Sequence, residues 1–135
     1  MKKQITIFLA VIAISYNAQS QTGSHLVKWY NIEEAIKLNE KNPKKIFIDV
    51  FTDWCGWCKT MDKNTFSNPQ IAEYLNKYYY PVKLNAEQKQ DINYKGTIYK
   101  NKGTDSRSPH DFASALLSGK MSYPSVVYMD GESNL

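Results

Sequence analysis

Residues 45–59 read KIFIDVFTDWCGWCK and set the architecture that we expect for this chain. The first half, Lys45 to Phe51, is a nearly continuous run of β-branched and aromatic residues of strand length, which predicts a buried central strand. Cys55 and Cys58 follow directly after this run, and residues 59–63 continue in types that a helix tolerates. We therefore expect a strand, a turn and then a helix whose N-terminus carries both cysteines.

The flanking sequence predicts further helices and strands around this segment. A helix is expected after Asn31, because Glu34 three residues later completes a capping-box pattern. A second helix is expected after Asn68, with Pro69 at its first position, and strand character returns from residue 78 to 84. A strand, a helix and a strand within about 40 residues form a βαβ unit, whose crossover is expected to be right-handed.

The segment from residue 88 to 107 is polar, rich in lysine and punctuated by glycine, and we interpret it as an insertion. Both a small hairpin turning at residues 95–96 and a mobile loop fit its composition. A helix beginning at Ser108-Pro109 and a strand over residues 125–129 are expected to follow it.

Composition restricts the classes of protein that fit. The chain has 135 residues, of which 42% are hydrophobic and 22% charged, as expected for one globular domain. Lys and Arg number 17 against 13 Asp and Glu, a net charge of +4. Without Lys2 and Lys3, which lie in a predicted leader, the charge is about +2, too small and too scattered to indicate nucleic acid binding.

The first 21 residues predict a secretory signal peptide. The basic pair Lys2-Lys3 precedes an apolar run from residue 5 to 14, which is about half the length of a membrane-spanning helix. We expect cleavage after Ser20, which divides the chain into a signal peptide, residues 1–20, and a domain, residues 21–135; the alternative is an uncleaved N-terminal anchor. Cleavage predicts an exported protein without stable membrane insertion, in the periplasm or secreted, where a disulfide can persist.

The spacing of Cys55 and Cys58 favours redox chemistry. Cysteines at i and i+3 of a helix share a face and can close a disulfide, but so short a loop restrains the unfolded chain little. The helix N-terminus is expected to lower the pKa of Cys55 from about 8.5 and make it the nucleophile, with Cys58 resolving the mixed disulfide. The alternatives are a structural disulfide and half of a zinc site, but zinc needs four ligands and only His25 and His110 could add to the pair. We therefore predict no metal.

Residues 51–59 resemble the active-site segment of the thioredoxin superfamily, and the resemblance covers residues 26–131. It implies an α/β, three-layer thioredoxin-like fold around a central mixed sheet. It also implies that Asp49 helps to move the proton of Cys58 and that Lys83 neighbours this acid. From the residues alone, the alternative is that Asp49 and Lys83 form merely a buried ion pair.

The resemblance also indicates where a substrate would bind. Tyr123-Pro124 matches the family's cis-proline loop, which holds the substrate chain by its backbone, although a trans proline before a strand is the ordinary alternative. Trp54, Gly56 and Trp57 surround the cysteines. The two tryptophans are expected to form an apolar rim for an incoming peptide, or else to be core residues.

Together these features predict an exported thiol–disulfide oxidoreductase that reduces or isomerises protein disulfides. Its partners would be protein or peptide thiols and disulfides and a further redox protein, and no cofactor is expected beyond the Cys55–Cys58 disulfide. A peptide-binding module with an inert disulfide and a disulfide-forming oxidase are the alternatives.

Two departures from the family pattern bear on this prediction. Gly56-Trp57 replaces the Gly-Pro of thioredoxin, so the redox potential of thioredoxin does not carry over. The sequence stops at Leu135, where the family continues with a final strand and helix. We expect a C-terminally incomplete domain with an uncovered edge strand and marginal stability, either a fragment or one that a partner completes.

Overall fold

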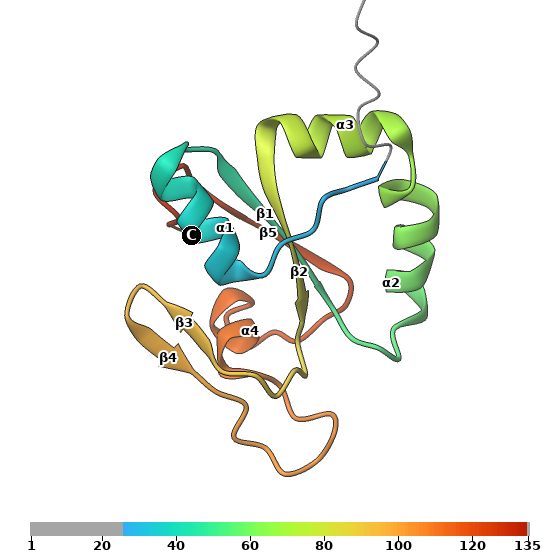
Figure 1. Cartoon of the computed structure of the whole chain (residues 1–135). Helices are drawn as coiled ribbons and strands as arrows, with labels where there is room; N and C mark the ends of the chain where they lie inside the picture. The colour runs from blue at the N-terminus through green and yellow to red at the C-terminus, as the bar shows by residue number, and fades with distance from the viewer. Residues whose placement is uncertain (1–25, 135) are drawn as a thin grey trace, which may run out of the picture.

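The computed structural model describes residues 26–134, so the predicted signal peptide lies outside the described residues. Its centre is a mixed sheet of three strands in the order β2-β1-β5 (Figure 1). The central strand β1 (Lys45–Phe51) runs parallel to β2 (Tyr79–Asn85) and antiparallel to β5 (Ser125–Met129). The predicted central strand and mixed sheet are confirmed.

Both faces of β1 are covered, which explains why its sequence is continuously apolar rather than alternating. Ile46, Ile48 and Val50 are fully buried on one face. Phe47 and Asp49 alternate with them and therefore point to the opposite face, where Phe47 belongs to a second apolar cluster.

Helices cover the two faces as separate layers (Figure 1). The face of Ile46 packs against α1 (Ile32–Lys41) and α4 (Asp111–Leu116). The opposite face packs against a longer helical segment and the helix that follows it; these are α2 (Gly56–Met61), the π-helical turn η1 (Asp62–Phe66) and α3 (Pro69–Tyr78). The result is the three-layer arrangement that the resemblance to the thioredoxin superfamily implies.

The predicted helix starts are confirmed at α1 and α3, and α4 starts later than expected. Asn31 accepts a hydrogen bond from the Glu34 amide at 2.8 Å, and the Asn31 amide donates to the Glu34 carboxylate at 3.2 Å. Asn68 caps α3 by accepting the Gln70 amide at 2.9 Å, without the reciprocal bond that Glu34 makes in α1. The cap of α4 is His110 rather than Ser108, because the buried His110 ring accepts the Phe112 amide at 3.1 Å.

The insertion after β2 forms a hairpin, the first of the two alternatives. Its strands are β3 (Ile92–Tyr94) and β4 (Thr97–Tyr99), and its turn residues Lys95 and Gly96 have φ values of +50° and +82°. Positive φ at both positions is the conformation of a type I′ hairpin turn. Tyr94 and Tyr99 both pack on the Phe112 ring, with centroids 5.3 and 5.2 Å away, so the hairpin is anchored to the core.

Strand β5 lies at an edge of the sheet, as the sequence predicts. Val126 and Tyr128 on this strand are exposed, although the Tyr128 ring still contacts Phe47. Across residues 26–134, no helix combines the length and the apolar character needed to cross a membrane.

Asn39 joins the end of α1 to two other parts of the chain. Its side chain is buried, donates to the Gly131 carbonyl at 2.8 Å and to Ser133 Oγ at 2.9 Å, and accepts the Lys44 amide at 2.7 Å. The start of the central strand and the segment after β5 are therefore held by one amide group.

Replacing this amide should destabilise the domain. We expect Asn39→Ala to lower the free energy of unfolding by about 2–3 kcal/mol, because it leaves buried polar groups without partners. Asn42→Ala is the matched control, since the Asn42 side chain is exposed, and it should change stability by less than about 0.5 kcal/mol. Urea denaturation measures both values, and equal effects would contradict the role given to Asn39.

Candidate functional site

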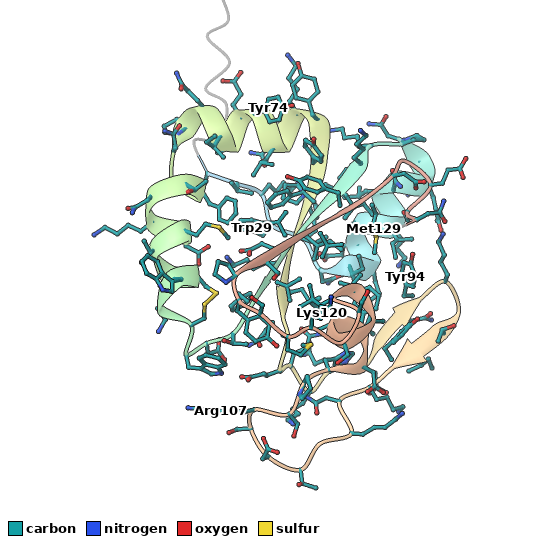
Figure 2. The ribbon with its side chains drawn as sticks, turned by 180° about the vertical axis from the view of Figure 1, so that it is seen from behind. Trp29, Tyr74, Tyr94, Arg107, Lys120 and Met129 are labelled. Carbon is teal, nitrogen blue, oxygen red and sulfur yellow. A yellow bond between two sulfur atoms is a disulfide. The ribbon has the colours of Figure 1, made fainter. Side chains whose placement is uncertain are left out.

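Cys55 and Cys58 form a disulfide at the beginning of α2 (Figure 2). Cys55 is the N-cap residue of the helix, and its Sγ atom accepts a hydrogen bond from the Cys58 amide at 3.1 Å. Both residues are almost completely buried, with exposed fractions of 4% and 2%. The sequence-predicted pair thus lies at a helix N-terminus, where free amide groups and the helix dipole stabilise a thiolate on the first cysteine.

Local backbone geometry fixes this position. The Cys55 amide donates to the Thr52 carbonyl at 3.2 Å, which closes a turn directly after β1. Cys55 itself is extended, and its carbonyl accepts the Lys59 amide at 3.3 Å as the helix begins. The chain continues without a break from α2 into η1, so the dipole at Cys55 is that of a longer helical segment.

Asp49 is completely buried in β1 and points to the face that α2 covers. Its Oδ2 atom accepts a hydrogen bond from Lys83 Nζ at 2.5 Å. Its Oδ1 atom has no hydrogen-bond partner among the described residues. Burial raises the pKa of Asp49, and the hydrogen bond and positive charge of Lys83 only partly counteract this effect.

Lys83 joins Asp49 to a second acid, Asp62. Its ammonium group forms an ion pair with each carboxylate. It also lies 5.0 to 5.4 Å from the centroids of three aromatic rings, which belong to Trp29 (labelled in Figure 2), Phe51 and Phe66. Because the Asp62 side chain is 46% exposed, it links this buried charged group to solvent.

Asp62 is not among the site residues that the sequence pattern predicted. A signal was present, because Asp62 follows Cys58 by four residues and an i, i+4 pair shares one face of a helix. What the spacing could not show is that this face meets Lys83 of β2.

Trp54 and Trp57, which immediately precede Cys55 and Cys58 in the sequence, are exposed, with exposed fractions of 52% and 76%. The alternative that they are core residues is therefore wrong. Gly56 between the cysteines is exposed as well, and a Cβ atom added there would contact nothing within 4 Å. The surface around the cysteine pair is open and aromatic.

The Tyr123–Pro124 peptide bond is cis, as predicted. The Tyr123 ring meets the Trp54 ring edge-on, with centroids 6.0 Å apart, so the structure brings the proline loop to the rim of the cysteine pair. Burial and the nearby charge of Glu87 raise the pKa of Tyr123. Glu87 also accepts the Trp54 indole N–H at 2.9 Å, a contact that the sequence did not predict.

Within residues 26–134, no group of three His, Cys, Asp or Glu side chains is placed to hold a metal ion. His110 uses both ring nitrogens in the fold, with Nδ1 accepting the Phe112 amide and Nε2 lying 3.0 Å from the Gln90 carbonyl.

The mixed sheet between two helical layers, the cysteine pair at a helix N-terminus and the cis-proline loop that contacts Trp54 define a thioredoxin-like protein. A model of the family Thioredox_DsbH, described as "Protein of unknown function, DUF255", matches residues 13–106. The chain belongs to this family. The solved structure of a DsbH oxidoreductase shares the fold, with a TM-score of 0.55 and 18% identity over 81% of this chain and 69% of that chain.

Curated relatives match parts of the chain. An uncharacterized protein of Archaeoglobus fulgidus is 34% identical over 80 residues, which are 59% of this chain and 61% of that protein. The thiol:disulfide interchange protein DsbD of Escherichia coli K12 is 34% identical over 62 residues, 45% of this chain and 11% of DsbD. Human spermatogenesis-associated protein 20 is 33% identical over 67 residues, 49% of this chain and 8% of that protein. The chain therefore spans less than two thirds of each of these relatives.

The two neighbours of Asp49 should move its pKa in opposite directions. Lys83→Met removes a hydrogen bond and a positive charge, so it should raise the pKa of Asp49 further. Asp62→Asn removes a negative charge that raises this pKa, so it should lower it. Carbon-13 NMR titration of the Asp49 carboxyl group measures both shifts, and shifts of the same sign would contradict this arrangement.

The raised pKa of Asp49 also predicts a pH-dependent stability. The folded protein binds this proton more tightly than the unfolded chain, so the residue costs stability as the pH rises from about 3.8 through the folded-state pKa. Asp49→Asn removes this cost. In the oxidised proteins, the free energy of unfolding of the variant relative to wild type should therefore rise across that interval and then level off, as urea denaturation at several pH values would show.

Proposed function

We propose that this protein is an exported thiol–disulfide oxidoreductase that reduces or isomerises protein disulfides. The observation that carries the proposal is the position of Cys55, which caps a helix and is disulfide-bonded to Cys58 under an open aromatic rim. A cysteine thiolate at this position is stabilised by the helix N-terminus and is adjacent to a surface on which a peptide can lie.

In the reductive direction, the Cys55 thiolate attacks one sulfur of a substrate disulfide. The Cys55–substrate bond forms, the substrate S–S bond breaks, and the first substrate sulfur leaves as a thiolate. Cys58 then loses its proton and attacks the Cys55 sulfur, which releases the second substrate sulfur and forms the Cys55–Cys58 disulfide. Two electrons pass to the substrate, and a dithiol partner protein returns the pair to its reduced form.

Asp49 is proposed to accept the proton of Cys58 in the second step. Three observations support this role: the carboxyl group is fully buried, its pKa is raised, and Oδ1 is left without a hydrogen-bond partner among residues 26–134. A carboxylate with a raised pKa is a stronger base, and its open oxygen can take a proton. Lys83 holds the other oxygen, and Asp62 beside it offers a route to solvent.

The proposed substrate contacts are the rim of Trp54, Gly56 and Trp57 and the loop of Tyr123 and Pro124. The aromatic faces would cover the apolar side chains of an extended peptide, and the backbone beside the cis proline would pair with the peptide backbone. Export to the periplasm is part of the same proposal and depends on the leader in residues 1–20, because thiol–disulfide exchange serves folding in an oxidising compartment. The proposed partners are protein thiols and disulfides.

A titration of the purified protein in glutathione buffers, followed by tryptophan fluorescence, tests the proposal because Trp54 and Trp57 flank the sulfurs. We expect a reversible two-electron transition, with a potential near −270 mV for a reductase and toward −120 mV for an oxidase. A folded protein without a reversible transition would contradict the redox function and favour a peptide-binding module with an inert disulfide.

Serine variants of the two cysteines should block different steps of the reaction. With a disulfide substrate, Cys55→Ser should abolish reaction, whereas Cys58→Ser should accumulate a mixed disulfide that mass spectrometry detects. Each variant is the control for the other, since both lose the internal disulfide. Mixed disulfides on Cys55 and Cys58 in equal amounts would contradict the assigned roles.

A further inference from the structure

The segment after the hairpin is tied to the turn that follows β2, and Glu87 in this turn accepts the Trp54 indole N–H. Asn101 donates through its side-chain amide to the carbonyls of Glu87, Gln88 and Ser108, at 2.7 to 3.2 Å. Lys89 Nζ donates a hydrogen bond to the Asp105 carbonyl at 2.9 Å and two more, to Asn101 Oδ1 and to the Gly103 carbonyl. We call residues 100–110 the Asn101 loop.

The Asn101 loop places Arg107 against the rim. The Arg107 guanidinium lies over the Trp54 ring, 5.3 Å from its centroid. Figure 2 shows Arg107 on the loop after β4, at the same end of the molecule as the start of α2. The Arg107 amide donates to Asp105 at 2.8 Å, and Ser108 Oγ donates to the second Asp105 oxygen at 2.7 Å. Arg107 therefore lies in a turn that these hydrogen bonds hold in place.

Three groups from three parts of the chain contact the Trp54 side chain. Glu87 accepts its indole N–H, the Tyr123 ring meets it edge-on, and Arg107 covers it. Because Trp54 is the residue before Cys55 and is exposed, this cluster forms part of the surface next to the cysteine pair. The insertion thus contributes directly to the surface on which a substrate would lie.

The guanidinium of Arg107 is not used by the fold. In the part of the chain that the structure describes, it forms neither an ion pair nor a side-chain hydrogen bond. The cation–π contact orients the group through its charge but leaves its five N–H donors free. Two acids of the neighbouring segments have other partners: Glu87 accepts the indole N–H of Trp54, and Asp105 accepts hydrogen bonds within its own turn. An oriented guanidinium with free donors is suited to bind a carboxylate with two hydrogen bonds.

We propose that Arg107 determines substrate specificity by binding a carboxylate side chain that lies close to the reacting cysteine of an extended peptide. This inference deepens the proposed function and rests on it. The substrate class is therefore a peptide or protein segment with Asp or Glu flanking its disulfide.

The test uses three disulfide-linked peptides whose cysteines are flanked by glutamate, glutamine or lysine and are otherwise identical. The rate constant of each with the pre-reduced protein is measured in a single turnover by tryptophan fluorescence. For wild type we expect the order glutamate, glutamine, lysine, with about a tenfold difference between the extremes, as for one charge-assisted contact. Arg107→Ala should remove the preference for the glutamate peptide. Arg107→Lys should retain only part of this preference, because lysine lacks the planar pair of donors.

Two further variants separate this role from general effects. Lys100→Ala removes the same charge from the insertion but at a residue paired with Asp91, so it should keep the preference. Gly103→Ala keeps Arg107 but adds a Cβ atom that would overlap the Ser108 side chain, so it should displace the loop and reduce the preference. An equal preference in wild type and Arg107→Ala would overturn the inference while leaving the proposed function intact.

A binding measurement keeps the inference testable without turnover. The same peptides with serine in place of cysteine are labelled with fluorescein, and their affinity for the oxidised protein is measured by anisotropy. Tighter binding of the glutamate peptide to wild type, lost in Arg107→Ala, would support the inference. A lack of disulfide reduction in the kinetic experiment would contradict only the proposed function. Equal affinities for the glutamate and lysine peptides would overturn it.

Discussion

The hydrogen bond between Lys83 Nζ and Asp49 Oδ2 joins the two parallel strands of the sheet on the face that α2 covers. The two residues are direct partners in the register of β1 and β2, so the sheet itself sets their separation. A slip of one residue would move either side chain to the opposite face and leave an unpaired charge in the core. The register of β1 and β2 therefore also fixes the position of the Asp49 carboxyl group. The helix that carries the cysteines packs over this face of the sheet.

The surroundings of Lys83 explain how a charged group remains in this layer. Three aromatic rings lie about its ammonium group, and Asp62 brings a second carboxylate from the helical segment that begins at Cys55. This arrangement connects a buried acid to the surface through one lysine. At the other end of the site, Trp54 is held by Glu87 in the turn after β2, by Tyr123 in the proline loop and by Arg107 in the insertion. The interior and the rim are thus positioned by different parts of the chain.

Much of the fold could be predicted from local patterns in the sequence. The continuous apolar run at Lys45–Phe51 predicted the central strand, and the Asn31 capping box predicted α1, because both depend on neighbours in sequence. The hairpin in the insertion remained one of two alternatives, since its polar strands carry little periodicity of their own. Its formation depends on Tyr94 and Tyr99 packing on α4, a contact between segments that the local pattern does not encode.

The sequence by itself determined the disulfide-forming pair at Cys55 and Cys58, because a three-residue spacing at a helix N-terminus brings the two sulfurs together regardless of the remaining chain. Only the tertiary structure decided that Asp62 joins the Asp49–Lys83 pair and that Arg107 covers Trp54. These contacts join residues 21 and more positions apart, and their geometry depends on how helices and loops dock on the sheet. Such docking is fixed by packing across layers rather than by any pattern along the chain.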